Sequence, residues 1–116
     1  MQYLLLIYND ENRMMAMSEA EAAAQMAAYG EFTESIVKSG HLRAGDRLRP
    51  TSTATTVRVK DGKTLTTDGP FAETREQLGG YYLVEAKDID EAVSIAARIP
   101  GAKNGSIEVR PIWPHS

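Results

Sequence analysis

A short segment in the second half of the chain carries the side chains best suited to chemistry. Residues 68–71 read Asp-Gly-Pro-Phe, and further charges follow at once. The charged side chains of this segment are Asp68, Glu73, Arg75 and Glu76. Pro70 fixes its own φ and Gly69 can adopt backbone angles that other residues avoid, so the loop has a restricted shape. A carboxylate such as Asp68, aimed into a cleft, would be suited to general acid or base catalysis.

A structural role explains the same carboxylate equally well. Asp68 can accept hydrogen bonds from backbone N–H groups two or three residues further on and so brace the turn. Glu73, Arg75 and Glu76 then form a solvated turn. If they line a cleft instead, Arg75 is the side chain suited to bind a substrate carboxylate, with Glu73 beside it. Phe71 is expected to fill a core or an interface, and a platform for a bound ligand is the alternative.

The strand that follows begins with two glycines and two tyrosines. Gly79 and Gly80 precede a strand and do not join a strand to a helix, so the phosphate-binding geometry of a nucleotide fingerprint is missing. Tyr81 and Tyr82 point to opposite faces of that strand. One of them is expected to be buried and the other to face a cleft, and the register decides which.

The histidines and the missing cysteines narrow the chemistry further. His41 follows the predicted end of a helix, where a capping or surface role is expected, and His115 lies beside the chain end. Neither has a partner at metal-ligand spacing, and no Ser-His-Asp arrangement is visible. The sequence contains no cysteine, which excludes thiolate sites and disulfides. We therefore predict no metal and no cofactor.

Length and composition indicate one globular domain over residues 1–116. The apolar fraction of 42% and the charged fraction of 25% are ordinary for a soluble protein. A net charge of −3 with scattered basic residues argues against a nucleic-acid surface. The longest apolar run, residues 3–8, is too short to cross a membrane, and a cytoplasmic location is expected.

Capping residues and apolar periodicity predict the helix that follows the first strand. Ser18 and Glu21 form a capping box, and Gly40 is placed to end the helix after about 22 residues. Gly30 inside it costs ~1 kcal/mol relative to alanine, which indicates a close approach to the sheet. The expected buried stripe consists of Met26, Tyr29, Thr33, Ile36 and Val37.

Alternating apolar residues and turn signals predict the remaining elements. Residues 42–48 are irregular or a short strand, and Asp61-Gly62 is a hairpin signal. A second helix starts at the Asp88 cap, and Pro100-Gly101 closes it. The predicted strands are residues 3–8, 53–59, 63–67, 80–85 and 107–110.

The order β-α-β-β-β-α-β favours an α+β, ferredoxin-like sandwich with two helices on one face of an antiparallel sheet. The other sheet face then needs a cover, because residues 3–8 are apolar on both sides and no predicted element is left over. A second copy of the chain is the expected cover, which gives a homodimer. Ile112 and Trp113 would suit an arm laid on that partner.

With these residues in view, the chain resembles the YCII-related family, specifically its DGPF-domain branch. The matching segments are residues 1–8, 28–30, 53–59, 61–63, 67–74, 76–83, 96–100 and 108–111. The resemblance implies a dimeric, ferredoxin-like α/β-barrel fold. Proteins of the related YciI branch have a His-Asp pair in a cleft near the dimer interface. In this chain the position of that histidine falls on Tyr29, so the pair does not carry over. Proximity of DGPF-type genes to sigma-factor genes suggests a regulatory role.

Two functions follow from these observations. The first is a non-catalytic homodimer that binds a small molecule or acts in regulation, with a cleft near the dimer interface. The second is a cofactor-free isomerase or lyase in which Asp68 is the general acid or base. Tyr29 or Tyr82 would then donate a hydrogen bond, and Arg75 would orient an anionic substrate. No complete catalytic constellation is visible in the sequence, which favours the first function.

Overall fold

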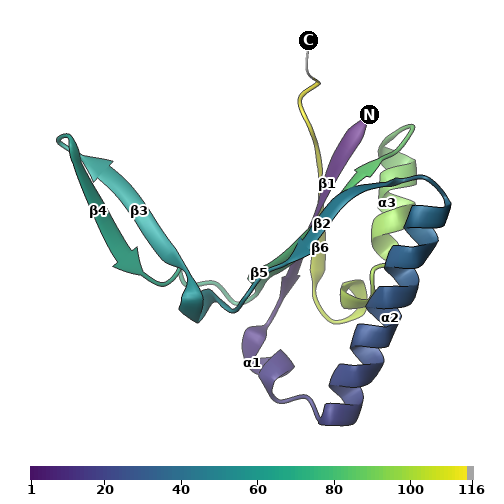
Figure 1. Ribbon diagram of the computed structural model, residues 1–116, viewed down its shortest axis with the longest axis horizontal. Coiled ribbons are helices and arrows are strands. Elements are labelled where there is room, and N and C mark those ends of the chain that lie inside the picture. The colour runs from purple at the N-terminus through teal and green to yellow at the C-terminus, as the bar shows by residue number, and fades with distance from the viewer. Residues whose placement is uncertain (115–116) are drawn as a thin grey trace.

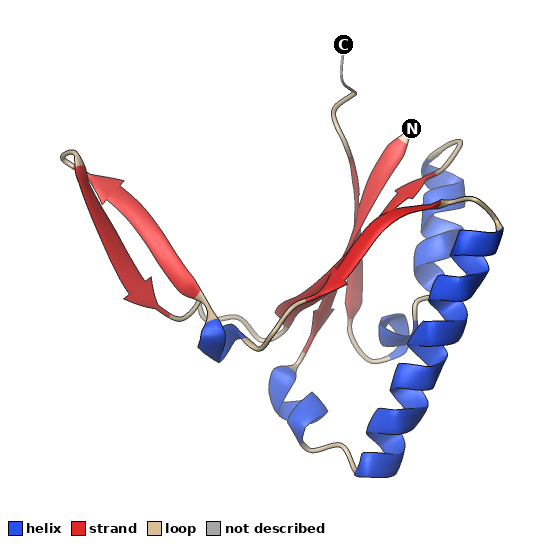
Figure 2. Cartoon of the chain, viewed as in Figure 1, coloured by secondary structure: helices blue, strands red, loops and turns tan. Residues whose placement is uncertain are grey.

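The computed structural model describes residues 1–114; His115 lies outside the described residues. Its main sheet is antiparallel, with the strand order β2-β5-β1-β6. The four strands are β1 (Gln2–Asn9), β2 (Leu42–Arg47), β5 (Gln77–Glu85) and β6 (Ser106–Pro111). Helices α2 (Glu19–Lys38) and α3 (Ile89–Ala97) both lie on one face of this sheet (Figures 1 and 2). This is the predicted α+β, ferredoxin-like arrangement.

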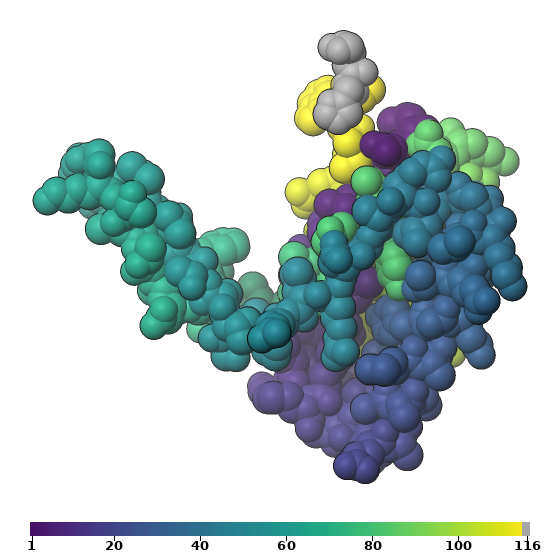
Figure 3. All heavy atoms as spheres, viewed as in Figure 1, coloured from purple at the N-terminus to yellow at the C-terminus, as the bar shows by residue number. Residues whose placement is uncertain are grey.

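Strands β3 (Thr55–Lys60) and β4 (Lys63–Asp68) form a separate two-stranded sheet, which we call the arm. The hairpin itself was predicted, and its turn contains Asp61 at φ 53° and Gly62 at φ 76°. Its two strands pair from Thr55 opposite Asp68 to Lys60 opposite Lys63. The arm extends on the side of the main sheet opposite the helices, and in space-filling view it stands apart from the body (Figures 2 and 3).

Two segments adopt more regular structure than their residues indicated. Residues 42–47 are a full edge strand, because Leu42 to Arg47 pair with β5 across a bulge. The segment after β1, which shows no helical periodicity, forms a short helix, α1 (Glu11–Met15). Asp10 caps α1 by accepting a hydrogen bond from the Asn12 N–H at 3.0 Å. A local cap of this kind stabilises a helical turn even where the sequence lacks apolar periodicity.

The ends of α2 follow the prediction, whereas its buried face is shifted. Ser18 and Glu21 form the expected capping box, and Gly40 takes φ +79° after the last turn. Phe32 and Ile36, four residues apart, are the side chains that α2 buries, while Met26 and Val37 are mostly exposed. With 3.6 residues per turn, Phe32 lies at the centre of the buried face of α2. Met26 and Val37 both lie to the same side of that face, away from the sheet.

The core lies between the helices and one face of β1. Tyr3, Leu5 and Ile7 alternate along that strand and are buried, and the α3 side joins them through residues such as Ile95 and Ile99. Leu5 and Ile36 are fully buried. The complete buried cluster comprises Tyr3, Leu5, Ile7, Phe32, Ile36, Val84, Ala86, Ala92, Ile95, Ala96 and Ile99.

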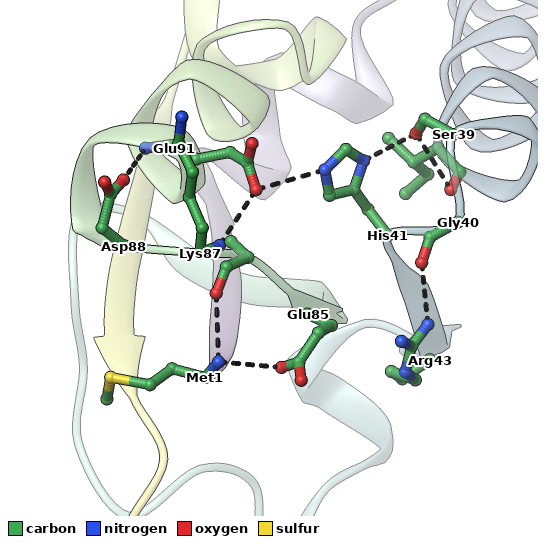
Figure 4. A network of polar contacts seen from close by, with 11 residues as sticks. Met1, Ser39, Gly40, His41, Arg43, Glu85, Lys87, Asp88 and Glu91 are labelled. Carbon is green, nitrogen blue, oxygen red and sulfur yellow. Dashed lines mark hydrogen bonds and ion pairs between the residues drawn. The ribbon is translucent and has the colours of Figure 1, made fainter.

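A polar network joins the end of α2 to the start of α3 (Figure 4). Asp88 caps α3 by accepting from the Glu91 N–H at 2.9 Å, and the Glu91 carboxylate accepts from the Lys87 N–H at 3.0 Å. The same carboxylate lies 3.3 Å from Nε2 of His41, whose Nδ1 lies 2.6 Å from the Ser39 hydroxyl. The helices are therefore tied together at this end by hydrogen bonds as well as by apolar packing.

Two glycine substitutions should change stability in opposite directions. Gly30 was expected to touch the sheet, but this prediction was wrong: a Cβ at that position would meet nothing within 4 Å. Gly30→Ala should therefore raise the free energy of unfolding by about 0.5–1 kcal/mol through helix propensity alone. Urea denaturation of both proteins measures this difference, and a lower stability of the alanine variant would contradict it.

Gly101→Ala is the matched substitution at a crowded site. A Cβ at Gly101 would lie 2.6 Å from the Tyr29 hydroxyl oxygen and 3.3 Å from Nδ2 of Asn9. Overpacking of this kind costs about 1–3 kcal/mol, so the variant should unfold at lower urea concentration than the wild type. Equal stability of the two proteins would show that the Tyr29 ring moves freely.

The Glu91 network should give stability a pH dependence of known sign. The Lys87 N–H, and more weakly His41, hold the pKa of the Glu91 carboxyl below its ordinary value despite some opposing desolvation. A carboxyl with a lowered pKa in the folded state stabilises that state above its unfolded pKa, about 4.3, and loses this effect as the pH falls. Glu91→Gln should thus be less stable than the wild type at pH 7 but not at pH 3.

Asp90→Asn is the control for the Glu91 variant, because Asp90 lies in the same helical turn and carries the same charge. It accepts no side-chain hydrogen bond within residues 1–114, so its effect reports charge alone. Denaturant unfolding at pH 7 and pH 3 compares the three proteins. A loss in the Asp90 variant as large as that in the Glu91 variant would rule out the network as the cause.

Candidate functional site

The candidate residue Asp68 lies at the end of β4, where the arm returns to the body. It pairs across the hairpin with Thr55 and is exposed. Within the described residues its carboxylate takes part in no hydrogen bond or ion pair. The bracing of the loop comes from elsewhere: the Gly69 N–H donates to the Ala54 carbonyl at 2.7 Å, and the Thr56 hydroxyl donates to the Gly69 carbonyl at 2.8 Å. Asp68 therefore does not act as the turn brace that its position suggested.

The rest of the segment is turned toward the surface of the single chain. Gly69 adopts φ +95°, the left-handed conformation that glycine supplies. Phe71 is 78% exposed, and the side chains of Glu73 and Arg75 are exposed as well. Glu76 differs from them because its carboxylate accepts a hydrogen bond from the Ser106 hydroxyl at 2.7 Å.

The register of β5 decides the orientation of the two tyrosines. Tyr82 lies opposite Leu5 and points toward the helices, where its hydroxyl lies 2.7 Å from the Thr33 hydroxyl. Its ring meets Phe32 edge-on with the centroids 5.2 Å apart. Tyr81 points to the other face and donates a hydrogen bond to Asp46 at 2.6 Å. Tyr82 is thus engaged on the helix side, and Tyr81 is the tyrosine on the open face.

Tyr29 occupies a different part of the molecule from Asp68. Its hydroxyl oxygen accepts a hydrogen bond from the Gly101 N–H at 3.2 Å, where α2 meets the 3-10 turn η2 (Pro100–Lys103). Burial raises the pKa of the Tyr29 phenol, which keeps it protonated and suited to donate a hydrogen bond. Asp68 is the last residue of β4, whereas Tyr29 belongs to α2, and these two elements lie on opposite sides of the main sheet (Figure 1), so a single chain does not bring the two proposed catalytic residues together.

A serine, a histidine and a glutamate do lie in line, which no spacing along the chain indicated. Ser39, His41 and Glu91 form the chain of polar contacts described above (Figure 4). The Ser39 hydroxyl also lies 3.3 Å from the Ile36 carbonyl at the end of α2. None of the three residues lines either of the pockets described below. Their position between two helix ends accounts for them as a structural clamp.

A polar pocket of about 90 Å³ opens between α1, α2 and the loop before β6. Asn9, in phase with the buried Tyr3, Leu5 and Ile7, lies at its floor and is only 9% exposed. The Asn9 side chain makes no hydrogen bond within residues 1–114, and its amide atoms are open to the pocket rather than fully enclosed. A polar residue at a buried position of an alternating strand was the available sequence signal, and it was missed.

A second, more apolar pocket of about 260 Å³ lies at the other end of the sheet. It is lined by residues of both chain ends and by Glu85, with Ile112 and Trp113 among them. Trp113 is 90% exposed. Its open shape and apolar walls make this region an extension of the open face of the sheet.

Within residues 1–114, no group of three or more metal-ligating side chains is assembled. No helix of these residues combines the length and the apolar character needed to cross a bilayer.

Comparison with known proteins places the chain in a family. The family description of the YCII-related domain matches residues 1–116. An uncharacterized protein of Rhizobium meliloti (strain 1021) is 41% identical over 114 residues, which cover 97% of this chain and 92% of that protein. A match over the full length and this level of identity lead to one conclusion: the chain belongs to the YCII-related family.

Proposed function

We propose that the protein acts as a cytoplasmic homodimer that binds a small molecule in a cleft near the dimer interface and serves a regulatory, non-catalytic role. The observation that carries this proposal is the open face of the main sheet, which lies opposite the helices and which residues 1–114 of one chain leave uncovered.

The open face is apolar at its centre and polar at its edges. Two rows of side chains cross the strands in the order β2, β5, β1, β6: Ala44, Leu83, Leu4 and Arg110, then Asp46, Tyr81, Leu6 and Glu108. Leu4, Leu6 and Leu83 are half-buried by their neighbours alone. An apolar centre with a polar rim is the usual anatomy of a protein interface. Each leucine would contribute about 1.5–3 kcal/mol if it were fully buried.

Within residues 1–114, the two strands of the arm contact each other far more than they contact any other element. The exposed apolar side chains of the arm are Val57 (58%), Val59 (71%) and Leu65 (48%). Val57 and Val59 share one face of the hairpin, because residues two apart on a strand point the same way. An isolated two-stranded hairpin is only marginally stable in water. The arm is therefore expected to lie against another surface.

A second copy of the chain is the partner that fits both features. The arm and the open face border one wedge of space beside the body (Figure 3). A two-fold axis would place each open face against the other and each arm along its partner. The Cα radius of gyration, 16.2 Å, exceeds the roughly 13 Å expected of a compact chain of this length. Dimerisation restores the compactness that the single chain lacks.

This arrangement would bring the Asp68 segment to the edge of the interface. The base of the arm carries Asp68, Phe71, Glu73 and Arg75, all exposed in one chain. Phe71 would supply an apolar wall, and Arg75 would pair with an anionic group of the ligand. Asp68 would accept hydrogen bonds from the ligand, because its carboxylate accepts none within residues 1–114. The enzyme alternative has less support, because Asp68 and Tyr29 are separated within the chain.

Light scattering tests the dimer directly. At micromolar concentration the wild type should show a mass of about 25 kDa, twice the 12.7 kDa of the chain. Leu83→Glu places a charge at the centre of the open face and should shift the protein to monomer. Val93→Glu is the matched control, since Val93 is 50% exposed on α3, away from that face. A monomeric wild type would refute the proposal.

Removal of the arm tests its part in the dimer. The Gly69 N–H to Ala54 carbonyl contact of 2.7 Å shows that the two ends of the arm are close, so a Gly-Ser linker can replace residues 55–68. The shortened chain should keep the helical circular dichroism of the wild type. Its dimer should have a higher dissociation constant, so it should separate into monomers at protein concentrations at which the wild type stays dimeric. Unchanged dissociation would assign the interface to the open face alone.

Asp68→Asn tests recognition separately from stability. Because Asp68 is exposed and makes no hydrogen bond within the described chain, the free energy of unfolding should change by less than about 0.5 kcal/mol. In a thermal-shift screen of small metabolites, compounds that stabilise the wild type through the interface cleft should no longer stabilise the variant. Asp61→Asn, at the tip of the same arm, is the charge-matched control. Equal shifts in all three proteins would exclude Asp68 from binding.

A further inference from the structure

The floor of the polar pocket is shaped by glycines around the side chain of Asn9. A Cβ at Gly105 would lie 2.4 Å from Oδ1 of Asn9, and a Cβ at Gly101 would lie 3.3 Å from Nδ2. The loop before β6 can approach the amide this closely only because both positions lack a side chain. The amide is therefore held in place by packing, while its hydrogen-bonding capacity remains unused within residues 1–114.

The walls of the pocket carry charges of both signs. Arg13 donates one hydrogen bond, 3.2 Å long, to Asn104, and that bond orients its guanidinium group. Its remaining N–H groups are available, because a guanidinium has five donors. Opposite charges come from Asp10 and Glu21, which each use one carboxylate oxygen for a helix cap and keep the other. The exposed Arg13 guanidinium and two carboxylates thus surround an amide that is open to the pocket.

From this arrangement we propose that the pocket binds a small zwitterion, a molecule of the short α-amino acid class. The ligand carboxylate would pair with Arg13 and accept a hydrogen bond from the Asn9 amide. The ligand ammonium group would lie between Asp10 and Glu21. A volume of about 90 Å³ equals roughly three water molecules, which suits a ligand with at most a very small side chain.

This site is separate from the one assigned under the proposed function. Asn9 points to the helix side of the sheet, whereas the dimer is proposed to form on the opposite face. All lining residues belong to one chain. Binding should consequently persist in the Leu83→Glu monomer, so failure of the dimer and failure of this site are distinguishable.

Isothermal titration with glycine and L-alanine tests the proposal. Both should bind the wild-type protein at millimolar concentration or below. Acetate, which has only the carboxylate, and methylammonium, which has only the cation, should each bind at least tenfold more weakly. Bulky amino acids such as L-tryptophan should not bind, because the pocket has no room for the indole.

Two substitutions remove one charge each without disturbing the fold. Arg13→Gln retains a donor for Asn104, and Glu21→Gln retains the capping box, which accepts glutamine at that position. Each should weaken glycine binding at least tenfold, since hydrogen bonds to charged groups are the strong ones. Arg43→Gln is the control, because Arg43 is exposed and donates to the Gly40 carbonyl outside the pocket.

The site is supported if Arg13→Gln and Glu21→Gln both weaken glycine binding and Arg43→Gln leaves it unchanged. If glycine does not bind at concentrations up to roughly ten millimolar, the proposed site is overturned. Equal binding of acetate and glycine, unaffected by Glu21→Gln, would overturn the zwitterion and leave an anion site. Circular dichroism of every variant separates lost binding from lost folding.

Discussion

Strand β1 has two apolar faces, and a chain of this size supplies one layer of helices to cover one of them. The rest of the structure follows from this constraint. Tyr3, Leu5 and Ile7 anchor the core against α2 and α3, while Leu4 and Leu6 remain at the centre of the open face. Apolar surface of this extent is favourable only when it is removed from water. The arm, which packs little against the other elements of residues 1–114, lies on the side of that same face.

The two proposed sites lie on opposite sides of β1. On the open side, recognition would involve the Asp68 segment at the base of the arm and would depend on assembly. On the helix side, Asn9 continues the buried alternation of β1 but replaces a hydrocarbon with an amide at the strand end. Polar groups at largely buried positions are normally hydrogen-bonded, and the Asn9 amide, which is open to the pocket, could bond a ligand there.

The local elements could be predicted because their signals are local. The Ser18-Glu21 capping box, the Gly40 cap and the Asp61-Gly62 turn each act within a few residues, and each formed where expected. The stripe on α2 was less predictable, since the exact rotation of a helix depends on the sheet beneath it. Gly30 illustrates the limit: a glycine in a helix indicates either close packing or nothing, and only the neighbouring surface distinguishes them.

The sequence by itself determined the fold class, because capping residues, turns and alternating strands fix the order of elements. Its resemblance to known sequences, above all in residues 67–74 and 76–83, indicated the family. The sequence also predicted the special backbone conformation of Gly69, next to Asp68. Only the tertiary structure decided that Tyr82 faces the helices and Tyr81 the open face, because the strand register sets both at once. It likewise separated Asp68 from Tyr29 and gathered Asn9, Arg13 and Glu21 into one pocket. Contacts between distant segments arise from packing, and no spacing along the chain records them.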